Sequence, residues 1–344
     1  MHLSKPLTYL LILCILGVLN ACRLSLPSLE GDVLPGISHN SATTSSPVPT
    51  RTIQVPATRP PTATLTPVPT EPPWTCAPGS FTNHLNVMDK ERSYNLHVPP
   101  NFTQGMPLMI NFHGYDSTAQ DEEEYTSTSI LADKEGFIVA YPQALRSPAQ
   151  WNLESGEEDV DIPFVRALID TIIKHCDSDP RRVYVTGMSN GGGMTNRVGC
   201  ELSRQVAAIA PVAGAYGFFG TCDVKRPLPV LAFHGTEDEM VPYEGSGAPE
   251  SLNVSIGAWP PIPYWAATWA LRNDCAARPT VVSHKNGILL ETWGECRDGV
   301  EVTLYTIEGG KHVWPGYTSD LRDRSVFHAS RIIWDFFKKY SLPQ

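Results

Sequence analysis

The chain has 344 residues, of which 42% are hydrophobic and 18% are charged, and its formal net charge is −10. Nucleic-acid binding requires a basic surface, so an acidic chain without a run of lysine or arginine argues against nucleic acid as a partner. An acidic protein of this kind suits a neutral or polymeric substrate.

The first 21 residues predict an export signal. Lys5 precedes an apolar run from Leu7 to Leu19, which is too short to span a bilayer and fits the core of a signal peptide. Residues 19–22 (LNAC) resemble a bacterial lipobox, in which Cys22 is lipidated and becomes the mature N-terminus. Plain secretion and an uncleaved membrane anchor are the alternatives, and all three place the protein outside the cell.

The composition changes in residues 22–75. Nine of the chain's 31 prolines fall between Pro47 and Pro73, among threonine, serine, valine and alanine. Such a segment has no apolar periodicity and too little apolar surface to bury, so it stays extended. We predict a disordered stalk that holds the next domain away from a membrane or wall. A linker with no role beyond distance is the alternative.

Residues 76–344 remain for folding, a normal size for one domain with a sizeable core. Strand-like and helix-like segments alternate along it, which implies a mostly parallel sheet with helices on both faces. Strands are predicted near residues 94–98, 107–112, 137–141, 182–186, 206–212, 228–233 and 302–307. Helices are predicted before residue 137 and near residues 164–173, 190–200, 264–272 and 327–340. The acidic run from Glu122 to Glu124 is interpreted as a solvent-exposed helix start.

One predicted strand leads into a candidate nucleophile. Residues 187–191 read GMSNG, a G-x-S-x-G pentapeptide between the strand at 182–186 and a glycine-rich helix. In a nucleophile elbow the serine lies on a strained turn, and flanking glycines let the strand and helix pass close together. The pentapeptide alone is weak, since chance supplies roughly 0.1 copies in such a chain. Its strand-turn-helix context makes Ser189 the candidate.

Two later strands end beside the residues that an activated serine requires. Asp238 follows the strand at 228–233, and His312 follows the strand at 302–307. The order Ser189, Asp238, His312 is that of an α/β-hydrolase, with the last two on loops at strand ends. An imidazole takes the proton of the serine hydroxyl, and a carboxylate fixes the imidazole's tautomer and stabilises its charged form.

Further residues are expected around this centre. Backbone N–H groups near Tyr115 and at Asn190 are predicted to face the developing oxyanion, and each such donor contributes on the order of 3 kcal/mol. His113 and Trp314 are candidates for contact with the substrate. Shaping the oxyanion loop is the alternative for His113, and anchoring its own loop is the alternative for Trp314. His234 is expected to fix the loop that presents the acid.

Three separated motifs resemble one esterase family. The segments RVYVTGMSNGGGMT, FHGTEDEMVPYEG and GGKHVWPG are similar to signatures of the secreted polyhydroxybutyrate depolymerase, feruloyl esterase and acetylxylan esterase group. The resemblance runs from about Cys76 to Tyr340. It implies an α/β-hydrolase fold without a cofactor, with Ser189 as nucleophile, Asp238 as acid and His312 as base. Lys311, which precedes His312, differs from the small residue that is usual at this position in the family.

The predicted domain contains six cysteines. An even number in an exported chain predicts disulfides, and the spacings match no zinc pattern, so we expect no metal. Places in the expected fold favour the pairs Cys176–Cys200, Cys275–Cys296 and Cys76–Cys222. The first pair would join two helix ends beside the nucleophile strand, and the second would bracket a hairpin. The third would tie the start of the domain to the loop after 206–212.

The expected function is that of an extracellular serine carboxylesterase acting on ester-linked acyl groups of a polysaccharide, with a feruloyl group preferred. A polyhydroxybutyrate depolymerase and an acetylxylan esterase are the alternatives with the same chemistry. Outside this class, a serine peptidase of α/β-hydrolase type and a non-catalytic surface binding protein stay open. The expected partners are an ester-bearing polysaccharide or polyester, and a membrane only through the N-terminal lipid.

Overall fold

The computed structural model describes residues 76–343 apart from 155, 157–158, 218–221, 246–258 and 319–326. The predicted export signal, Cys22 and the stalk lie outside the described residues.

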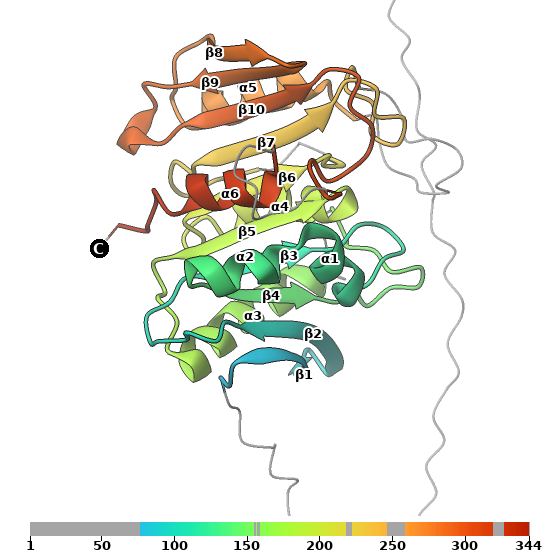
Figure 1. The fold of residues 1–344 in the computed structure, drawn as a ribbon, viewed down its shortest axis with the longest axis vertical. Coiled ribbons are helices and arrows are strands. Elements are labelled where there is room, and N and C mark those ends of the chain that lie inside the picture. The colour runs from blue at the N-terminus through green and yellow to red at the C-terminus, as the bar shows by residue number, and fades with distance from the viewer. Residues whose placement is uncertain are drawn as a thin grey trace, which may run out of the picture. The chain divides into compact units, whose positions relative to one another are not determined.

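The described part alternates strands and helices along one sheet (Figure 1). The strands are β1 (Gly79–Val87), β2 (Lys90–Val98), β3 (Leu108–Phe112), β4 (Ile138–Pro142), β5 (Val183–Met188), β6 (Ala208–Val212), β7 (Val230–Gly235), β8 (Thr280–Lys285), β9 (Ile288–Trp293) and β10 (Val302–Ile307). The helices are α1 (Ala119–Thr126), α2 (Thr128–Glu135), α3 (Asp161–Cys176), α4 (Asn190–Glu201), α5 (Ile262–Arg272), α6 (Ala329–Phe337) and the 3-10 turn η2 (Arg297–Gly299).

The described strands form one sheet in the order β1-β2-β4-β3-β5-β6-β7-β10-β9-β8. The strands from β4 to β10 in this order run parallel to one another. Antiparallel pairs flank them, with β1 and β2 at one edge and β9 and β8 at the other. Parallel strands point the same way, so their carboxyl ends share one edge of the sheet. The loops that follow β3, β5, β7 and β10 therefore converge at this edge.

Helices cover both faces of the parallel part. Alternate strand side chains point to opposite faces, and strands buried on both faces read as continuous apolar runs. Ile110 and Val185 pack with α3, α4 and α5 in one core cluster. Met109 and Tyr184 pack with α2 and α6 in the other. Figure 1 shows the same division, with α1, α2 and α6 in front of the strands. The predicted α/β-hydrolase architecture is confirmed.

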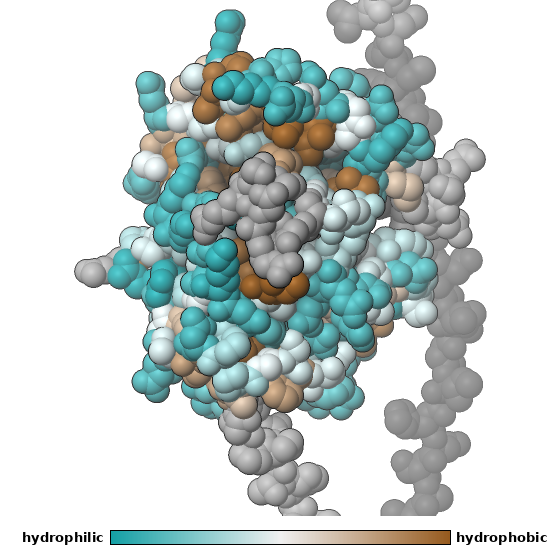
Figure 2. Space-filling model, in the orientation of Figure 1, coloured by the Kyte–Doolittle hydropathy of each residue, from teal (hydrophilic) through white to brown (hydrophobic). Residues whose placement is uncertain are grey.

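The far edge of the sheet is more exposed than its centre. Val281 and Val282 in the edge strand β8 are 58% and 59% exposed. Figure 2 shows hydrophobic residues gathered toward the end formed by β8 and β9, on a face that is otherwise largely hydrophilic.

Within the described ranges, no helix combines the length and the apolar character needed to cross a membrane.

Strand β1 was not among the predicted elements. Its side chains are mostly exposed and polar, so its sequence carries no core pattern. It forms because it pairs with β2 along its whole length, from Gly79 opposite Val98 to Val87 opposite Lys90. Pairing with a neighbouring strand thus overrides a weak local preference.

Two of the three predicted disulfide pairings are wrong. The structure pairs Cys76 with Cys176 and Cys200 with Cys222, rather than Cys176 with Cys200 and Cys76 with Cys222. The predicted Cys275–Cys296 pair is present and brackets the β8–β9 hairpin. The two helix ends do not meet because α3 packs toward β1, whereas α4 packs against β5 and β6.

Candidate active site

Ser189 occupies the turn between β5 and α4. Its backbone has φ 57° and ψ −119°, a positive φ that is strained for a residue with a side chain. A Cβ atom on Gly191 would lie 2.1 Å from the carbonyl oxygen of Phe112, and one on Gly187 would lie 2.7 Å from the carbonyl oxygen of Gly191. Glycine is therefore required on both sides of the turn, which is why the G-x-S-x-G pattern places a serine here.

The predicted acid and base are hydrogen-bonded to each other. His312 Nδ1 donates to Asp238 Oδ2 over 2.7 Å. The other carboxylate oxygen, Oδ1, accepts from the backbone N–H groups of Met240 at 2.9 Å and Val241 at 2.8 Å. These bonds fix the carboxylate, and the carboxylate fixes the imidazole with its proton on Nδ1. The second ring nitrogen, Nε2, is then the one that can accept a proton.

Asp238 is 4% exposed, and it remains ionised in this buried position. Burial by itself would raise the pKa of its carboxyl, but hydrogen bonds from His234 and His312 outweigh burial and hold the pKa well below its usual range. His234 Nε2 lies 3.3 Å from Asp238 Oδ2 and donates to the carbonyl oxygen of Val241 over 2.8 Å. His234 thus braces the loop of the acid, as expected.

A cavity of about 300 Å³ contains both Ser189 and His312 in its wall. Strand β5 lies between β3 on one side and β6 and β7 on the other. Polar residues reach the cavity from the loop after β3 and from α1, among them Glu122 and Tyr125. Apolar residues such as Val241 reach it from the β6–β7 side. The cavity therefore has chemically different walls on the two sides of the serine.

The predicted oxyanion donors lie in this same wall. Tyr115 and Asn190 both line the cavity beside Ser189. A Cβ on Gly114 would lie 3.5 Å from the Cβ of Ser189, so the loop after β3 runs directly past this serine. Asn190 is the first residue of α4, and the N–H groups in the first turn of a helix have no partner within that helix. The arrangement suits a pair of backbone donors to one oxygen atom.

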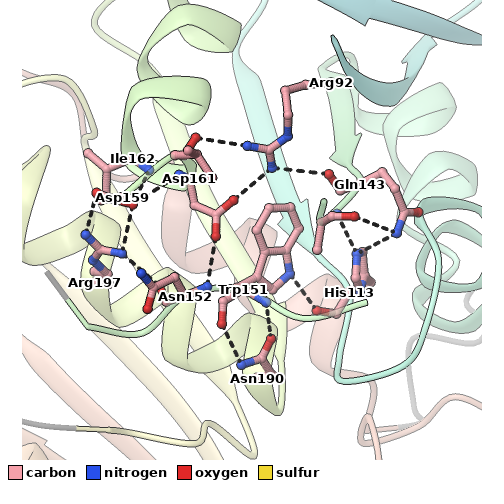
Figure 3. Close-up of polar contacts among 12 residues, drawn as sticks. Arg92, His113, Gln143, Trp151, Asn152, Asp159, Asp161, Ile162, Asn190 and Arg197 are labelled. Atoms are coloured by element: carbon pink, nitrogen blue, oxygen red, sulfur yellow. Dashed lines mark hydrogen bonds and ion pairs between the residues drawn. The ribbon is translucent and has the colours of Figure 1, made fainter. Parts of the chain in front are cut away.

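Trp151 connects the two sides of this predicted oxyanion hole (Figure 3). Its backbone N–H donates to Asn190 Oδ1 over 2.7 Å, and its carbonyl oxygen accepts from Asn190 Nδ2 over 3.2 Å. Its indole Nε1 donates to the carbonyl oxygen of His113 over 3.0 Å. The side chain is 2% exposed and packs edge-on to Phe112 at a ring-centroid distance of 5.0 Å. One residue thus holds the serine elbow and the loop after β3 together.

Two buried arginines hold the segment that carries Trp151. Arg92, which is 2% exposed, pairs with Asp161 over 2.8 Å, and Asp161 Oδ2 accepts from the backbone N–H of Asn152 over 2.8 Å. Arg197 pairs with Asp159 over 2.6 Å and donates to the carbonyl oxygen of Asn152 over 2.8 Å. Figure 3 shows both guanidinium groups meeting this segment. Burial lowers the pKa of Arg92, although its proximity to Asp161 opposes that shift.

His113 and Trp314 are not in the cavity wall, which corrects the expectation that they contact the substrate. Both side chains are 0% exposed. His113 Nδ1 donates to the carbonyl oxygen of Gly114 over 2.7 Å, while Nε2 accepts from the N–H of Ala144 over 3.1 Å, so it shapes the loop after β3. Trp314 Nε1 donates to Ser330 Oγ over 3.0 Å and anchors the loop of His312 to α6. The His113 ring lies against Trp151 at a centroid distance of 5.1 Å, and Trp314 packs in the core cluster that includes α6.

Sequence reasoning missed Glu122 as a residue of the site. The prediction that its acidic run is a solvent-exposed helix start is wrong for this residue. Glu122 is 3% exposed and lines the cavity. Its spacing from Ala119 and Thr126, which are also buried, is the helical periodicity that could have placed it on the inner face of α1.

The described residues contain no group of three histidine, cysteine, aspartate or glutamate side chains that could hold a metal ion. The cysteines from Cys76 onward are paired with one another in disulfides.

Comparison with known proteins relates the chain to esterases. Residues 92–223 match the family model described as esterase PHB depolymerase. It is 33% identical over 259 residues to feruloyl esterase B of Piromyces equi, covering 71% of this chain and 44% of that protein. It is 26% identical over 256 residues to the bifunctional acetylxylan esterase/xylanase XynS20E of Neocallimastix patriciarum, covering 73% and 34%. The chain thus spans less than half the length of these two relatives.

A solved structure shares the fold. The acetyl xylan esterase from Aspergillus awamori superposes with a TM-score of 0.54, covering 75% of this chain and 99% of that one at 14% identity. At that identity the likeness shows the fold alone.

Proposed function

We propose that this protein is a serine carboxylesterase that removes ester-linked acyl groups from a polysaccharide, with a feruloyl group preferred. One observation carries the proposal: Ser189 and His312 line one cavity, and His312 is bound to the buried Asp238 over 2.7 Å. A hydroxyl, an imidazole and an ionised carboxylate in this order are the components of acyl transfer through a covalent intermediate.

The proposed reaction has two halves. His312 Nε2 takes the proton of Ser189 as its oxygen attacks the ester carbonyl, and the N–H groups of Tyr115 and Asn190 stabilise the oxyanion. His312 then gives the proton to the departing alcohol. Water attacks the acyl-serine with His312 again as base, which releases the acid and restores the serine.

The relatives support the choice of substrate class. A feruloyl esterase and a bifunctional acetylxylan esterase/xylanase are among them, and these names give a feruloyl ester and acetylated xylan as the compounds that those proteins act on. Acetylxylan and polyhydroxybutyrate are the second candidates. Two comparisons support polyhydroxybutyrate as one of these second candidates. They are the description of the matching family and a relative from Paucimonas lemoignei named poly(3-hydroxyalkanoate) depolymerase C.

An extracellular location is part of the proposal. Three disulfides are typical of proteins that fold in an oxidising compartment. The N-terminal sequence adds an export signal, with Cys22 as the predicted lipid attachment point. Mass spectrometry of the mature protein from its host tests the lipid, because a thioether-linked diacylglycerol on Cys22 adds a defined mass to the N-terminal peptide.

A substrate panel tests the activity. The purified protein is assayed on methyl ferulate, acetylated xylan and a hydroxybutyrate oligomer, together with a chromogenic ester and its matching amide. We expect turnover of the esters, highest on the ferulate, and none of the amide. Amide cleavage at a comparable rate would favour a peptidase, and no turnover of any compound would favour a binding protein.

Ser189→Ala tests the nucleophile. Removing the hydroxyl leaves no group to form the acyl intermediate, so kcat should fall by roughly 10³-fold or more with the melting temperature unchanged. Ser283→Ala, in the edge strand β8, is the matched control and should keep wild-type turnover. Activity above a few per cent in Ser189→Ala would remove this residue from the mechanism.

A further inference from the structure

Glu122 is a buried acid for which the reaction above has no use. It lies on the inner face of α1, is 3% exposed, and lines the cavity that contains Ser189 and His312. Its Oε1 atom is buried and has no hydrogen-bond partner among the described residues. Burying a polar group without a partner costs on the order of 1–3 kcal/mol, so an unsatisfied carboxyl in a cavity wall calls for a ligand.

The surroundings of Glu122 favour its un-ionised form. Burial raises the pKa of its carboxyl well above the ordinary value. An open hollow of about 570 Å³ adjoins the cavity at this residue, and the other charged residues that line it, Asp121 and Glu124, are acidic. Among the described residues, no lysine or arginine lines either space, and the histidine that does, His312, is hydrogen-bonded to Asp238. An un-ionised carboxyl can donate one hydrogen bond and accept others. A hydroxyl group does the same, so the two groups match.

The topology places Glu122 across Ser189 from His312. His312 is tied to Asp238, which follows β7. Glu122 belongs to α1, which follows β3 on the opposite side of β5. Within one cavity, Glu122 therefore lies on the other side of Ser189 from the residue that would protonate the departing alcohol.

We propose that the Glu122 carboxyl hydrogen-bonds a hydroxyl oxygen of the acyl group, and that this contact makes the enzyme selective for hydroxylated over unsubstituted acyl groups. This specificity role rests on the esterase activity proposed above. Tyr125, whose hydroxyl accepts from the N–H of Trp314 over 3.1 Å, lies in the same wall and still has its own proton to donate. A site built to bind a hydroxyl disfavours the analogue that lacks it, because its polar groups are then left unpaired.

Two methyl esters that differ by one hydroxyl test the proposal: methyl 4-hydroxycinnamate and methyl cinnamate. In the wild type, kcat/KM should be at least about tenfold higher for the hydroxylated ester. Glu122→Leu should reduce this ratio to near one, by lowering kcat/KM for the hydroxylated ester while leaving the other unchanged or improved. Glu122→Gln keeps the shape and a hydrogen-bond donor, and should retain most of the preference. Glu124→Gln, exposed on the same helix, is the control.

The outcomes separate the two proposals. Equal kcat/KM for the two esters in the wild type, or an unchanged ratio in both Glu122 variants, overturns the role of Glu122 and leaves the esterase. A parallel loss on both esters also overturns it, because it indicates a structural role. A wild type that hydrolyses neither these esters nor a chromogenic acetate removes the esterase activity and the selectivity together.

Discussion

At the scale of single residues, the site combines a strained serine with two buried acids. Ser189 owes its place to a backbone conformation that its glycine neighbours allow. Asp238 and Glu122 are both almost fully buried, yet their pKa values move in opposite directions. The difference lies in partners: hydrogen bonds from two histidines and two backbone N–H groups stabilise the charge of Asp238, whereas Glu122 Oε1 has no donor among the described residues.

Replacing Asp238 with asparagine should disable the base without removing it. An amide at this position can donate a hydrogen bond to Nδ1, which would put the proton of His312 on the wrong nitrogen. We expect kcat to fall by roughly 10⁴-fold, as measured by turnover of a chromogenic ester at neutral pH. Glu237→Gln removes a neighbouring exposed charge that pairs with Lys311 and should change kcat by less than a few fold. Similar losses in the two variants would contradict a specific role for Asp238.

Glu122→Gln should change how stability depends on pH. The folded-state pKa of Glu122 is raised above its unfolded value, so the folded protein holds this proton more tightly. Its contribution to stability is complete below the unfolded pKa of about 4.5 and is lost as the pH rises toward the folded pKa. The variant should therefore gain stability relative to the wild type between pH 4 and pH 8. Urea unfolding of both proteins at the two pH values measures this, and a constant difference would contradict the raised pKa.

At the scale of elements, the segment from Gln143 to Leu153 acts as a strut between the loop after β3 and the elbow after β5. Its residues are described and belong to no helix or strand, so its shape depends on side-chain hydrogen bonds from Arg92 and Arg197. Breaking one partner of a buried ion pair leaves the other charge uncompensated, at a cost of about 3–5 kcal/mol. Loss of either pair is therefore expected to destabilise this segment.

Trp151→Phe should weaken the proposed oxyanion hole selectively. Phenylalanine keeps the ring contact with Phe112 but cannot donate to the carbonyl oxygen of His113. A small displacement of a catalytic donor is costly, so we expect kcat to fall roughly ten- to hundredfold with KM little changed. Trp269→Phe is the matched control, because Trp269 is equally buried in α5 and donates to Asn196 Oδ1 over 2.9 Å.

Both tryptophan variants should lose a similar amount of stability, about 1 kcal/mol for one hydrogen bond, in urea unfolding. Only the variant at Trp151 should lose turnover beyond what that stability loss explains. Equal kcat values in the two variants would show that Trp151 merely packs.

At the scale of the whole molecule, the disulfides close loops of very different length. Cys76–Cys176 spans 100 residues and joins the start of β1 to the end of α3, whereas Cys275–Cys296 spans 21 residues around one hairpin. The sheet centre, buried on both faces, holds together through its own core. The long crosslink instead ties the antiparallel β1–β2 edge to that centre.

Removing each disulfide by a double cysteine-to-serine change should show this difference. Loop-closure entropy assigns about 4.7 kcal/mol to the Cys76–Cys176 bond and about 3.3 kcal/mol to the Cys275–Cys296 bond. Denaturant unfolding of the two double variants measures the order, which we expect to follow loop length. Peptide mapping without reduction checks the pairing itself, and a peptide linking Cys76 to Cys222 would contradict the structure.

The sequence by itself determined the elements whose signals are local. Continuous apolar runs predicted the buried parallel strands, and the glycines beside Ser189 predicted the elbow, because each depends on residues within a few positions. The positions of Ser189, Asp238 and His312 were also predictable, because each follows a strand that is recognisable locally. Parallel strands then bring their carboxyl ends to one edge of the sheet.

Only the tertiary structure decided what depends on packing between distant segments. It paired Cys76 with Cys176 because α3 turns toward β1, and it made a strand of β1 through pairing alone. It places His113 and Trp314 outside the cavity wall and Glu122 within it. Which side of a loop or helix is covered is set by the elements that pack on it, and a linear pattern of residue types does not contain that information.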